Sequence, residues 1–426
     1  MLCVCGHNRT MTPTPTYDVL VVGGGPAGAR AAYELARLGH AVIIAERKVF
    51  PRDKTCGDVV SPRAVRSLQD MGLAAQLETA HRSRGVRTVA HGRTIEVPWP
   101  THPHLPDFGY VIKRHALDHL VLDHAAAAGT VVRSGHEAMS PLVERGFVRG
   151  AVLRNVSTDA TESIRARYVI VADGANSRFG RSLGTTRAKT WPHATAIRGY
   201  WASPKHAVHW VESTFDLRDR NGKPLPGYGW VFPLGDGTVN VGVGLLSTAR
   251  DFKSINTTQL LTEFAAAATQ RWELSEDPVT ELRGARLPMG GSVGPRSGPT
   301  YLVVGDAAGA VNPFNGEGIA YALETGLMAA HALHDALAGN DPRALTAYGR
   351  QFDHAYGSYF KVGRLFTRVV SHPLLMREAS RVAIHSKTLM EWLLRIMSNT
   401  LRPDEVGFAE ASYKILVQLN RLFPDA

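Results

Sequence analysis

The chain has 426 residues, which corresponds to two or three domains of ordinary size. Hydrophobic residues make up 44% and charged residues 20% of it, which excludes a wholly disordered protein. Three cysteines exclude a disulfide-built secreted fold and a cysteine-rich zinc site, whereas the net charge of +10 is compatible with nucleic acid, an anionic membrane or an acidic ligand.

Residues 1–16 are expected to form a disordered tail outside the fold, in which Met11 is a second candidate for the first residue of the protein. The tail contains two of the three cysteines and lacks the apolar stretch of a signal peptide. No apolar run in the sequence approaches the ~18 residues of a membrane span. We therefore expect a cytoplasmic protein in a reducing compartment.

The first predicted elements form a βαβ unit. The apolar runs Tyr17–Val22 and Ala41–Glu46 predict buried parallel strands, and Ala29–Leu38 predicts a helix between them that stops at Gly39. This order and these lengths are typical of the unit that opens a dinucleotide-binding domain.

The turn after the first strand has the spacing Gly23-x-Gly25-x-x-Gly28. Glycines at this spacing allow a tight turn, close approach of the backbone to a pyrophosphate, and close packing of the helix on the strand. Glu46, at the end of the second strand, stands where a carboxylate accepts from ribose hydroxyls and repels a 2′-phosphate. The unit therefore predicts FAD or NAD rather than NADP.

The middle of the chain changes character. Within residues 190–280 the run Tyr228–Leu246 alternates, and Gly235-Asp236-Gly237 lies inside it. Alternation around such a turn predicts the hairpins of an antiparallel sheet. Buried strands are predicted on both sides of this segment, one from Tyr168 and one at Tyr301–Val304.

The segment after the last of these strands distinguishes between the dinucleotides. Gly305-Asp306 ends the strand, and a carboxylate there can hold the ribityl hydroxyls of FAD. The turn Asn312–Ile319 opens a helix predicted from about Gly318 to Leu337, and its N–H groups can face the edge of a flavin ring. The predicted cofactor is therefore FAD.

Two polar motifs leave alternatives open. Asp173-Gly174, after the strand from Tyr168, either contacts the cofactor or forms a turn without a ligand. Arg114, three residues ahead of Leu117-Asp118 on a predicted helix, either reaches FAD or forms an exposed salt bridge. Helical periodicity alone favours the exposed arginine.

Together these motifs resemble the FAD-dependent oxidoreductases with a para-hydroxybenzoate hydroxylase-like fold. Within that group, Pro51-Arg-Asp-Lys-Thr-Cys-Gly-Asp58 and Pro226-Gly-Tyr-Gly-Trp-Val-Phe-Pro233 resemble the geranylgeranyl reductase family over roughly residues 17–340. Within the family the likeness is greatest to the menaquinone reductases, which saturate one isoprene unit of the quinone side chain. The resemblance implies an α/β, Rossmann-like FAD-binding domain with an inserted antiparallel β-sheet substrate domain and a helical C-terminal region.

The expected domains follow from this architecture. The FAD-binding domain is discontinuous and takes in 17–80, 108–185 and 281–342, the substrate domain takes in 81–107 and 186–280, and the helical region takes in 343–426. Carried over by position, the resemblance implies a cofactor-binding set made of the two glycine-rich turns, two strand ends and the Cys-Gly segment: Gly23, Gly25, Pro26, Ala27, Gly28, Glu46, Arg47, Cys56, Gly57, Asp58, Arg114, Asp306, Gly316, Gly318 and Ile319.

The chemistry requires a dry cavity with an acid beside the flavin, because an isolated trisubstituted alkene accepts hydride only as a proton reaches it. Cys56, the only cysteine after the tail, is either that acid, a flavin contact without proton transfer, or a small packing residue. Tyr228, Trp230 and Phe232 share one strand face, where aromatic rings either stabilise cationic character along a prenyl channel or simply fill a core. The catalytic candidates are Cys56, Tyr228 and Trp230.

The function predicted in this way is FAD-dependent saturation of a C=C bond in a polyprenyl chain, on menaquinone or a geranylgeranyl-type lipid. The sequence has no second Gly-x-Gly-x-x-Gly after a strand, so NAD(P)H or another external donor is expected to bring the electrons. Two alternatives stay open. One is an FAD-dependent monooxygenase of an aromatic or polyketide substrate, and the other is a non-catalytic flavin-bearing membrane adaptor.

The excess positive charge is concentrated near the C-terminus. Residues 361–402 contain eight basic and two acidic residues, which give +6 of the net charge of +10. These residues alternate with apolar ones, so the segment either lies peripherally on the anionic inner face of the cell membrane or packs on the body with a solvated face. Neither nucleic acid nor metal is expected, because no matching motif accompanies the charge or the 18 histidines.

Overall fold

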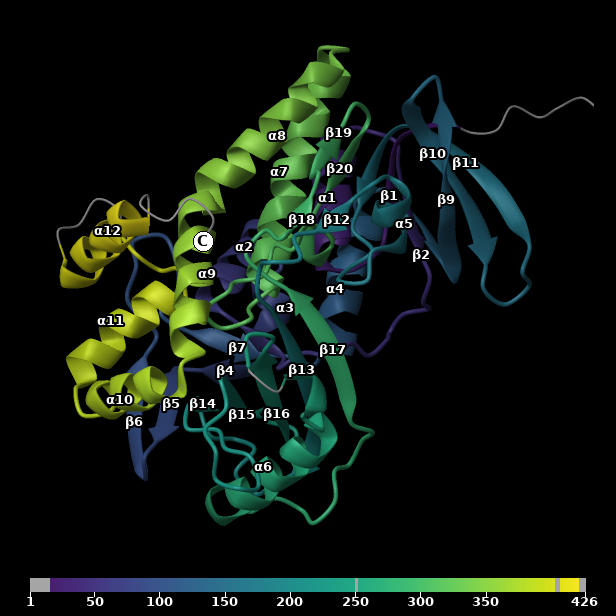
Figure 1. Ribbon diagram of the computed structural model, residues 1–426. Coiled ribbons are helices and arrows are strands. Elements are labelled where there is room, and N and C mark those ends of the chain that lie inside the picture. Colours follow the sequence, from purple (N-terminus) through teal and green to yellow (C-terminus); the bar gives the residue numbers. More distant parts are fainter. Residues whose placement is uncertain (1–15, 250–251, 403–406, 421–426) are drawn as a thin grey trace, which may run out of the picture.

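The computed structural model describes residues 16–249, 252–402 and 407–420, and Figure 1 shows two β-sheets with helices packed around them. Except for residue 16, which begins the first strand, the predicted N-terminal tail lies outside the described residues. The first sheet contains five parallel strands in the order β20-β11-β1-β2-β8, and β19 and the hairpin β9–β10 add antiparallel pairs. These strands are β1 (Thr16–Val22), β2 (Val42–Glu46), β8 (Val131–Ser134), β9 (His136–Glu144), β10 (Phe147–Asn155), β11 (Thr161–Val171), β19 (Ser297–Gly298) and β20 (Tyr301–Val303).

The parallel strands are buried on both faces. In β1, Val21 packs among the helices on one face, whereas Leu20 packs in a separate apolar cluster on the other face. Helix α1 (Pro26–Arg37) lies against both α4 (Arg114–Ala127) and α7 (Ile319–Ala338). Coverage of both faces explains why these strands are continuous apolar runs in the sequence. The predicted βαβ unit is confirmed, although α1 begins three residues earlier than predicted because proline is favoured in the first helical turn.

The second sheet has seven strands in the order β17-β13-β16-β15-β14-β5-β6. The predicted hairpin is confirmed, since β15 and β16 pair in antiparallel fashion across the turn that contains Gly235 and Gly237. One pair departs from the antiparallel pattern, because β14 runs parallel to β5. The strands are β5 (Gly85–Ala90), β6 (Arg93–Pro98), β13 (His193–Ala202), β14 (Trp210–Thr214), β15 (Gly227–Pro233), β16 (Thr238–Leu246) and β17 (Arg283–Pro288).

This sheet extends past the expected limit at residue 280, because β17 pairs along β13 and forms its edge. Helix α6 (Thr257–Trp272) covers one of its faces, where Phe264 and Trp272 join an apolar cluster with Val241 of β16. The other face carries aromatic side chains toward the first sheet. The division of the chain into domains stays a prediction.

Short elements connect the two sheets. A three-stranded sheet joins β3 (Val59–Val60), β7 (Gly109–Val111) and β4 (His81–Ser83), and a two-stranded one joins β12 (Thr186–Arg187) and β18 (Val293–Gly294). The short helices here are α2 (Pro62–Asp70), α3 (Ala74–Leu77) and α5 (Arg178–Ser182).

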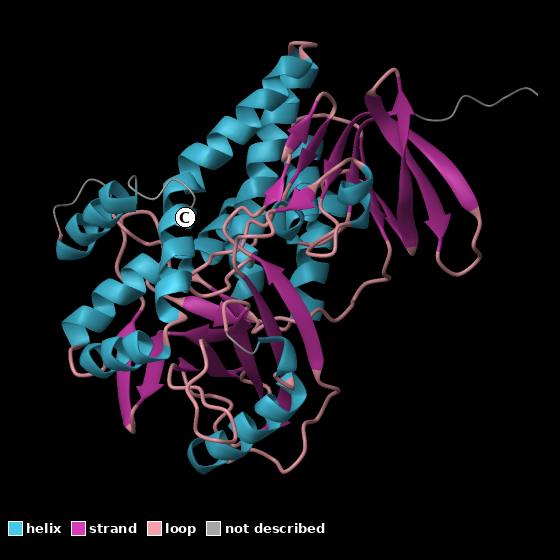
Figure 2. Ribbon diagram, in the orientation of Figure 1, coloured by secondary structure: helices cyan, strands magenta, loops and turns pink. Residues whose placement is uncertain are grey.

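The C-terminal region is helical, as predicted. It consists of α8 (Leu345–Phe352), α9 (Ser358–Val370), α10 (Pro373–Ala383), α11 (Lys387–Met397) and α12 (Phe408–Asn420). Figure 2 shows α8 and α9 as a long helical column beside the sheets, with α10, α11 and α12 grouped at one side of the molecule. Among the helices that the structure describes, none combines the length and the apolar character needed to cross a bilayer.

Candidate active site

A cavity of about 670 Å³ lies where the carboxyl ends of the parallel strands face the second sheet. Its volume is within the range of ligand-binding sites. Most of the predicted site residues line it: Gly23, Gly25, Pro26, Ala27, Glu46, Arg47, Cys56, Gly57, Arg114, Tyr228, Trp230, Asp306, Gly316, Gly318 and Ile319. Gly28 and Asp58 do not line it.

The three glycines of the first turn have different surroundings. Gly23 has a φ of 106°, and a Cβ there would lie 2.4 Å from the carbonyl oxygen of Ala172. A Cβ on Gly28 would lie 2.0 Å from the carbonyl oxygen of Gly23, so this glycine lets α1 pack closely on the strand. A Cβ on Gly25 would meet only the Arg52 guanidinium at 3.7 Å, so the backbone is open toward the cavity here.

Two helices begin at the cavity wall without a side-chain cap. Gly25 is the N-cap residue of α1 and Gly318 is that of α7, and neither has a side chain to accept from the first N–H groups. The first N–H groups of a helix have no partner within the helix, and the helix dipole makes this end partly positive. The cavity therefore offers two positions for anionic or electron-rich parts of a ligand.

Glu46 ends β2 inside this site. Its side-chain oxygens accept hydrogen bonds from the backbone N–H of Gly24 and of Lys48, each over 2.8 Å, and the residue is only 8% exposed. Both contacts fix the carboxylate at the strand end, beside the glycine turn. This is the position in which the sequence placed a ribose-binding carboxylate.

Arg114 forms a salt bridge, as one of the two alternatives predicted, but the residue is buried, so the prediction that this salt bridge is exposed was wrong. Its guanidinium binds both oxygens of Asp118 over 2.6 and 2.7 Å, and Arg52 binds the same carboxylate over 2.8 Å. Burial raises the pKa of Asp118, but Arg114 and Arg52 outweigh burial and hold the pKa below its usual value. Lys54 lies 3.6 Å from Asp306 across the same wall.

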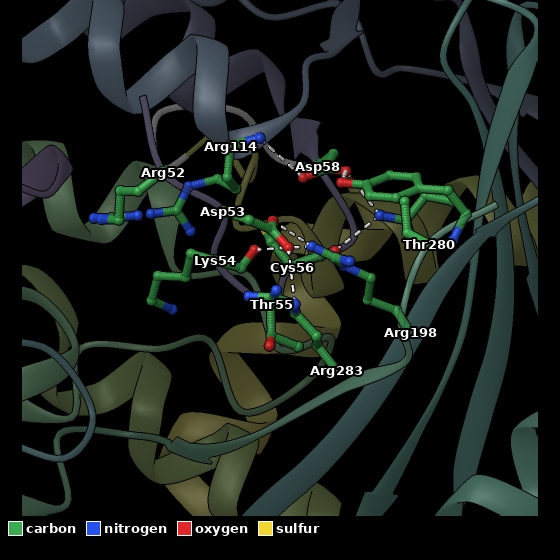
Figure 3. Close-up of polar contacts among 12 residues, drawn as sticks. Arg52, Asp53, Lys54, Thr55, Cys56, Asp58, Arg114, Arg198, Thr280 and Arg283 are labelled. Atoms are coloured by element: carbon green, nitrogen blue, oxygen red, sulfur yellow. Dashed lines mark hydrogen bonds and ion pairs between the residues drawn. The ribbon is translucent and has the colours of Figure 1, made fainter. Parts of the chain in front are cut away.

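The loop that carries Cys56 is anchored to the second sheet by Asp53. Arg198 of β13 and Arg283 of β17 both pair with its carboxylate, and Figure 3 shows both guanidinium groups next to it. Arg198 also donates to the carbonyl oxygen of Lys54 over 3.4 Å. The loop therefore bridges the two sheets along one wall of the cavity.

A row of aromatic rings forms the adjoining wall of the cavity. Ring centroids are 6.0 Å apart for Phe215 and Tyr228, 5.8 Å for Tyr228 and Trp230, and 6.0 Å for Trp230 and Phe232. A Cβ on Gly57 would lie 2.8 Å from the Phe232 ring, so the Cys56-Gly57 segment rests directly on this row. The strand-face pattern predicted for these aromatic residues is confirmed.

Tyr228 joins the aromatic row to the turn that opens α7. Its hydroxyl donates to the carbonyl oxygen of Asn315 over 2.7 Å. Burial, with a smaller effect from nearby Cys56, raises the pKa of Tyr228 above its ordinary value, which keeps the hydroxyl protonated.

Asp58, predicted as a cofactor contact, lies behind the loop and is completely buried. Its carboxylate accepts from the Tyr200 hydroxyl over 2.6 Å, the Asn240 amide over 2.8 Å and the backbone N–H of Arg114 over 3.3 Å. Burial raises the pKa of Asp58 to about 6, although the hydrogen bonds from Tyr200 and Asn240 and the positive charges of Arg198 and Arg114 oppose the shift. The left-handed backbone at Asp58, with φ of 67°, turns the side chain away from the cavity.

Asp173 was predicted either to contact the cofactor or to form a turn without a ligand, and the structure has features of both. It lines the cavity, and one carboxylate oxygen accepts from the backbone N–H of Phe179 over 3.0 Å. Burial raises the pKa of Asp173. Its other oxygen is buried without a hydrogen-bond partner.

Several residues of the site were missed in the sequence. Asp118 stands four residues after Arg114, a spacing that indicates a helical ion pair but not its burial. Asn240 interrupts the apolar residues of β16, and a polar residue in a buried strand is a signal of a specific hydrogen-bonding role. Arg52 and Lys54 belong to the Cys-Gly segment.

A smaller pocket adjoins the apolar end of the cavity. Phe215 and Val370 line both, so these two side chains form the partition between them. Beyond the partition the pocket, of about 20 Å³, is lined by Leu217, Leu225 and Met376 and also by polar side chains that include His91, Asp216 and Arg377. Among the described residues, no three His, Cys, Asp or Glu side chains are grouped as ligands of a metal ion.

Comparisons with known proteins place these features in a family context. Residues 16–220 match the family described as FAD binding domain. The chain is 39% identical to a menaquinone reductase of Mycolicibacterium smegmatis over 92% of this chain and 93% of that protein. It is 31% identical to a digeranylgeranylglycerophospholipid reductase of Methanopyrus kandleri over 82% of this chain and 89% of that protein.

The fold has a solved counterpart in a geranylgeranyl bacteriochlorophyll reductase-like protein from Thermoplasma acidophilum. The two structures superpose with a TM-score of 0.77 at 23% identity, over 94% of this chain and 99% of that one. The similarity therefore extends through both sheets and into the C-terminal helices.

Proposed function

The chain belongs to the menaquinone reductase family of FAD-dependent oxidoreductases, and from this premise we propose that it saturates one C=C bond in the polyprenyl side chain of menaquinone. The observation that carries the proposal is the position of the aromatic row. It lies directly against the Cys56-Gly57 segment, at the wall of the cavity into which two uncapped helix N-termini open.

FAD is the cofactor, and the described residues fit it. The open backbone at Gly25 and the N-terminus of α1 suit the pyrophosphate, and Glu46 suits the ribose hydroxyls. Gly318, at the start of α7, suits the electron-rich edge of the flavin ring. When bound and reduced, FAD supplies a hydride.

The second hydrogen of the new C–H pair is a proton, and two weak acids in the cavity can deliver it. The Cys56 thiol and the Tyr228 hydroxyl both line the cavity, and Tyr228 interacts electrostatically with Cys56. Trp230 presents an aromatic face beside them, where it can stabilise cationic character at the carbon that accepts hydride. We assign proton delivery to Cys56 or Tyr228 and stabilisation to Trp230.

Each turnover consumes two electrons and two protons, so an external donor must reduce FAD again. NAD(P)H or another reduced carrier fills this role in the proposal. The exposed basic residues Arg47, Lys48 and Arg286 line the cavity and favour an anionic donor.

Access to a lipid substrate favours contact with the membrane surface. Leu375 is 56% exposed and Val382 is 64% exposed on α10, and Arg377 and Arg381 are exposed on the same helix. Phe408 begins α12 nearby and is also exposed. We propose that this side of the molecule, shown with α10–α12 grouped in Figure 1, lies on an anionic bilayer.

The decisive experiment is anaerobic turnover of the FAD-loaded protein with dithionite and menaquinone. Mass spectrometry is expected to show a product heavier by one H₂, and tandem fragmentation is expected to place the added hydrogens in the side chain. A hydroxylated product formed only with oxygen would identify a monooxygenase. Bound FAD without turnover of menaquinone or a geranylgeranyl lipid would identify a non-catalytic protein.

A further inference from the structure

A buried asparagine lies behind the cysteine loop at a junction of three hydrogen bonds. Asn240 of β16 donates to the carbonyl oxygen of Cys56 over 2.8 Å and to the Asp58 carboxylate over 2.8 Å. Its side-chain oxygen accepts from the indole N–H of Trp230 over 2.9 Å. The Asn240 side chain is completely buried, and these three bonds engage both of its amide hydrogens and its oxygen.

The orientation of this amide is fixed by its partners. Rotation by 180° would place the Asn240 oxygen against the carbonyl oxygen of Cys56 and the carboxylate of Asp58, and it would leave the Trp230 N–H without an acceptor. A buried polar group without a partner costs about 1–3 kcal/mol. The amide therefore holds a single orientation.

Asp58 maintains this orientation by accepting hydrogen bonds from the groups around it. Each group that faces it is a donor: the Tyr200 hydroxyl, the Asn240 amide and the backbone N–H of Arg114. Arg198 and Lys113 lie over the Tyr200 ring, at 4.5 and 5.0 Å from its centroid, and these two cations pair with Asp53 and Asp236 respectively. Asp58 acts as an acceptor that anchors Asn240.

We propose that Asn240 is a positioning residue that fixes the Cys56 backbone and the Trp230 ring relative to one another. This inference rests on the proposed function for its role in turnover, because Cys56 and Trp230 are assigned there as reacting groups. Its structural content is independent of the substrate. Without Asn240, the Cys56 carbonyl and the Trp230 N–H each lose the partner that ties them to the same buried point.

The test uses the full-length protein in a Cys3→Ser, Cys5→Ser background, in which Cys56 is the only thiol. The rate of Cys56 alkylation by iodoacetamide is measured without substrate, and kcat and KM are measured with the FAD-loaded enzyme. Asn240→Leu is expected to change the alkylation rate several-fold. It is also expected to lower kcat by on the order of 10²-fold with little change in KM, because misplaced reacting groups carry costs of that size.

Tyr200→Phe is the matched control. It removes one hydrogen bond from Asp58 but leaves all three bonds of Asn240, so Tm falls while the alkylation rate and kcat stay at the parental values. If Asn240→Leu lowers Tm but keeps the parental alkylation rate and kcat, Asn240 is structural only and the proposal is wrong.

A second variant serves if Asn240→Leu does not fold. Asn240→Asp has nearly the same shape and, when it shares one proton with Asp58, keeps the bonds to Asp58 and Trp230. It loses only the donor to the Cys56 carbonyl, so altered Cys56 alkylation is expected here too, and a parental rate would overturn the proposal. If the parent enzyme reduces no prenyl substrate, the proposed function fails, while the alkylation rates still decide the role of Asn240.

Discussion

The hydroxyl of Tyr228 donates to the carbonyl oxygen of Asn315 over 2.7 Å, which joins the aromatic row of the second sheet to the turn that opens α7. That turn contributes Gly316 and Gly318 to the cavity. The aromatic wall and the turn assigned to the flavin edge are therefore held in register by one hydrogen bond. Tyr228, one of the two proposed acids, therefore also has a structural role at this contact.

Cys56→Ser is expected to retain FAD while alkene reduction slows. A general acid contributes about 10²–10⁴-fold, so a loss of that size would assign proton delivery to the thiol. Tyr228→Phe is the counterpart, and the variant with the larger loss of kcat at unchanged FAD content marks the donor. Cys3→Ser, in the N-terminal tail, is the control for thiol removal, and full activity of Cys56→Ser would remove Cys56 from the mechanism.

Alanine substitutions at Gly25 and Gly28 are expected to act differently. At Gly25 a Cβ would have room, so Gly25→Ala should leave Tm of the FAD-free protein unchanged and weaken FAD binding about tenfold by occupying the approach to the helix N-terminus. At Gly28 a Cβ would lie 2.0 Å from a backbone oxygen, so Gly28→Ala should lower Tm itself. Thermal unfolding with and without FAD measures both effects, and equal loss of Tm in the two FAD-free variants would contradict the assignment.

The sequence indicated the elements that depend on local pattern. The strand–turn–helix from Tyr17 to Leu38 was predictable because apolar periodicity and glycine spacing are local properties. The burial of Arg114 was not predictable, because it depends on Arg52, which is distant in sequence and binds the same carboxylate. The parallel pairing of β14 with β5 was missed for the same reason, since it joins segments more than 100 residues apart.

Asp58 was assigned to the cofactor because it follows the Cys-Gly pair, and only the fold shows that it faces the other way. The resemblance could locate the segment but not the direction of each side chain. In contrast, Tyr228 and Trp230 were placed correctly on one face, because strand geometry fixes the side on which alternate residues lie.

Stability is expected to fall as pH rises through 6, because of Asp58. Burial raises its pKa from 3.8 to about 6, so the folded protein holds this proton more tightly than the unfolded chain. The contribution is fully present below the unfolded pKa and is lost as pH rises through the folded one, with a total of roughly 3 kcal/mol. Glu317, whose pKa burial raises to about 7, acts in the same direction.

The free energy of unfolding in urea at pH 5, 6 and 7 tests this for the parent and Asp58→Asn. The difference between parent and variant should change by at most about 1.4 kcal/mol per pH unit, in the direction that makes the parent relatively less stable at pH 7. A difference that stays constant from pH 5 to pH 7 would show that Asp58 does not titrate in this range.

The partition formed by Phe215 and Val370 predicts a dependence on chain length. The aromatic row ends at Phe215, and the pocket beyond it measures only about 20 Å³ and is partly lined by Asp216 and Arg377, so the distal prenyl chain is expected to pack against the cavity side of Val370. Val370→Trp should therefore lower kcat/KM for a long-chain menaquinone by about tenfold or more and spare a short-chain analogue. Val369→Trp, at a neighbouring exposed position that lines neither cavity, is the control. Equal loss on both substrates would place the distal chain elsewhere.

The basic side of α10 predicts salt-dependent membrane binding. Arg377 and Arg381 lie one helical turn apart beside the exposed Leu375 and Val382, so charge and apolar surface can meet an anionic bilayer together. Each basic residue near such a surface contributes about 1 kcal/mol, so Arg377→Gln with Arg381→Gln should weaken binding to phosphatidylglycerol-containing vesicles by about 30-fold. The matched control is Arg343→Gln with Arg350→Gln, which removes two exposed charges between α7 and α9. Vesicle co-sedimentation at low and high salt measures the difference, and equal weakening by the two pairs would show that net charge rather than α10 drives binding.

Glu378 lies among these charges, because it pairs with Arg377 and is 4.0 Å from Arg381. Glu378→Gln should therefore strengthen vesicle binding. A gain in binding would distinguish an electrostatic contact from general loosening of the helix, which would weaken it.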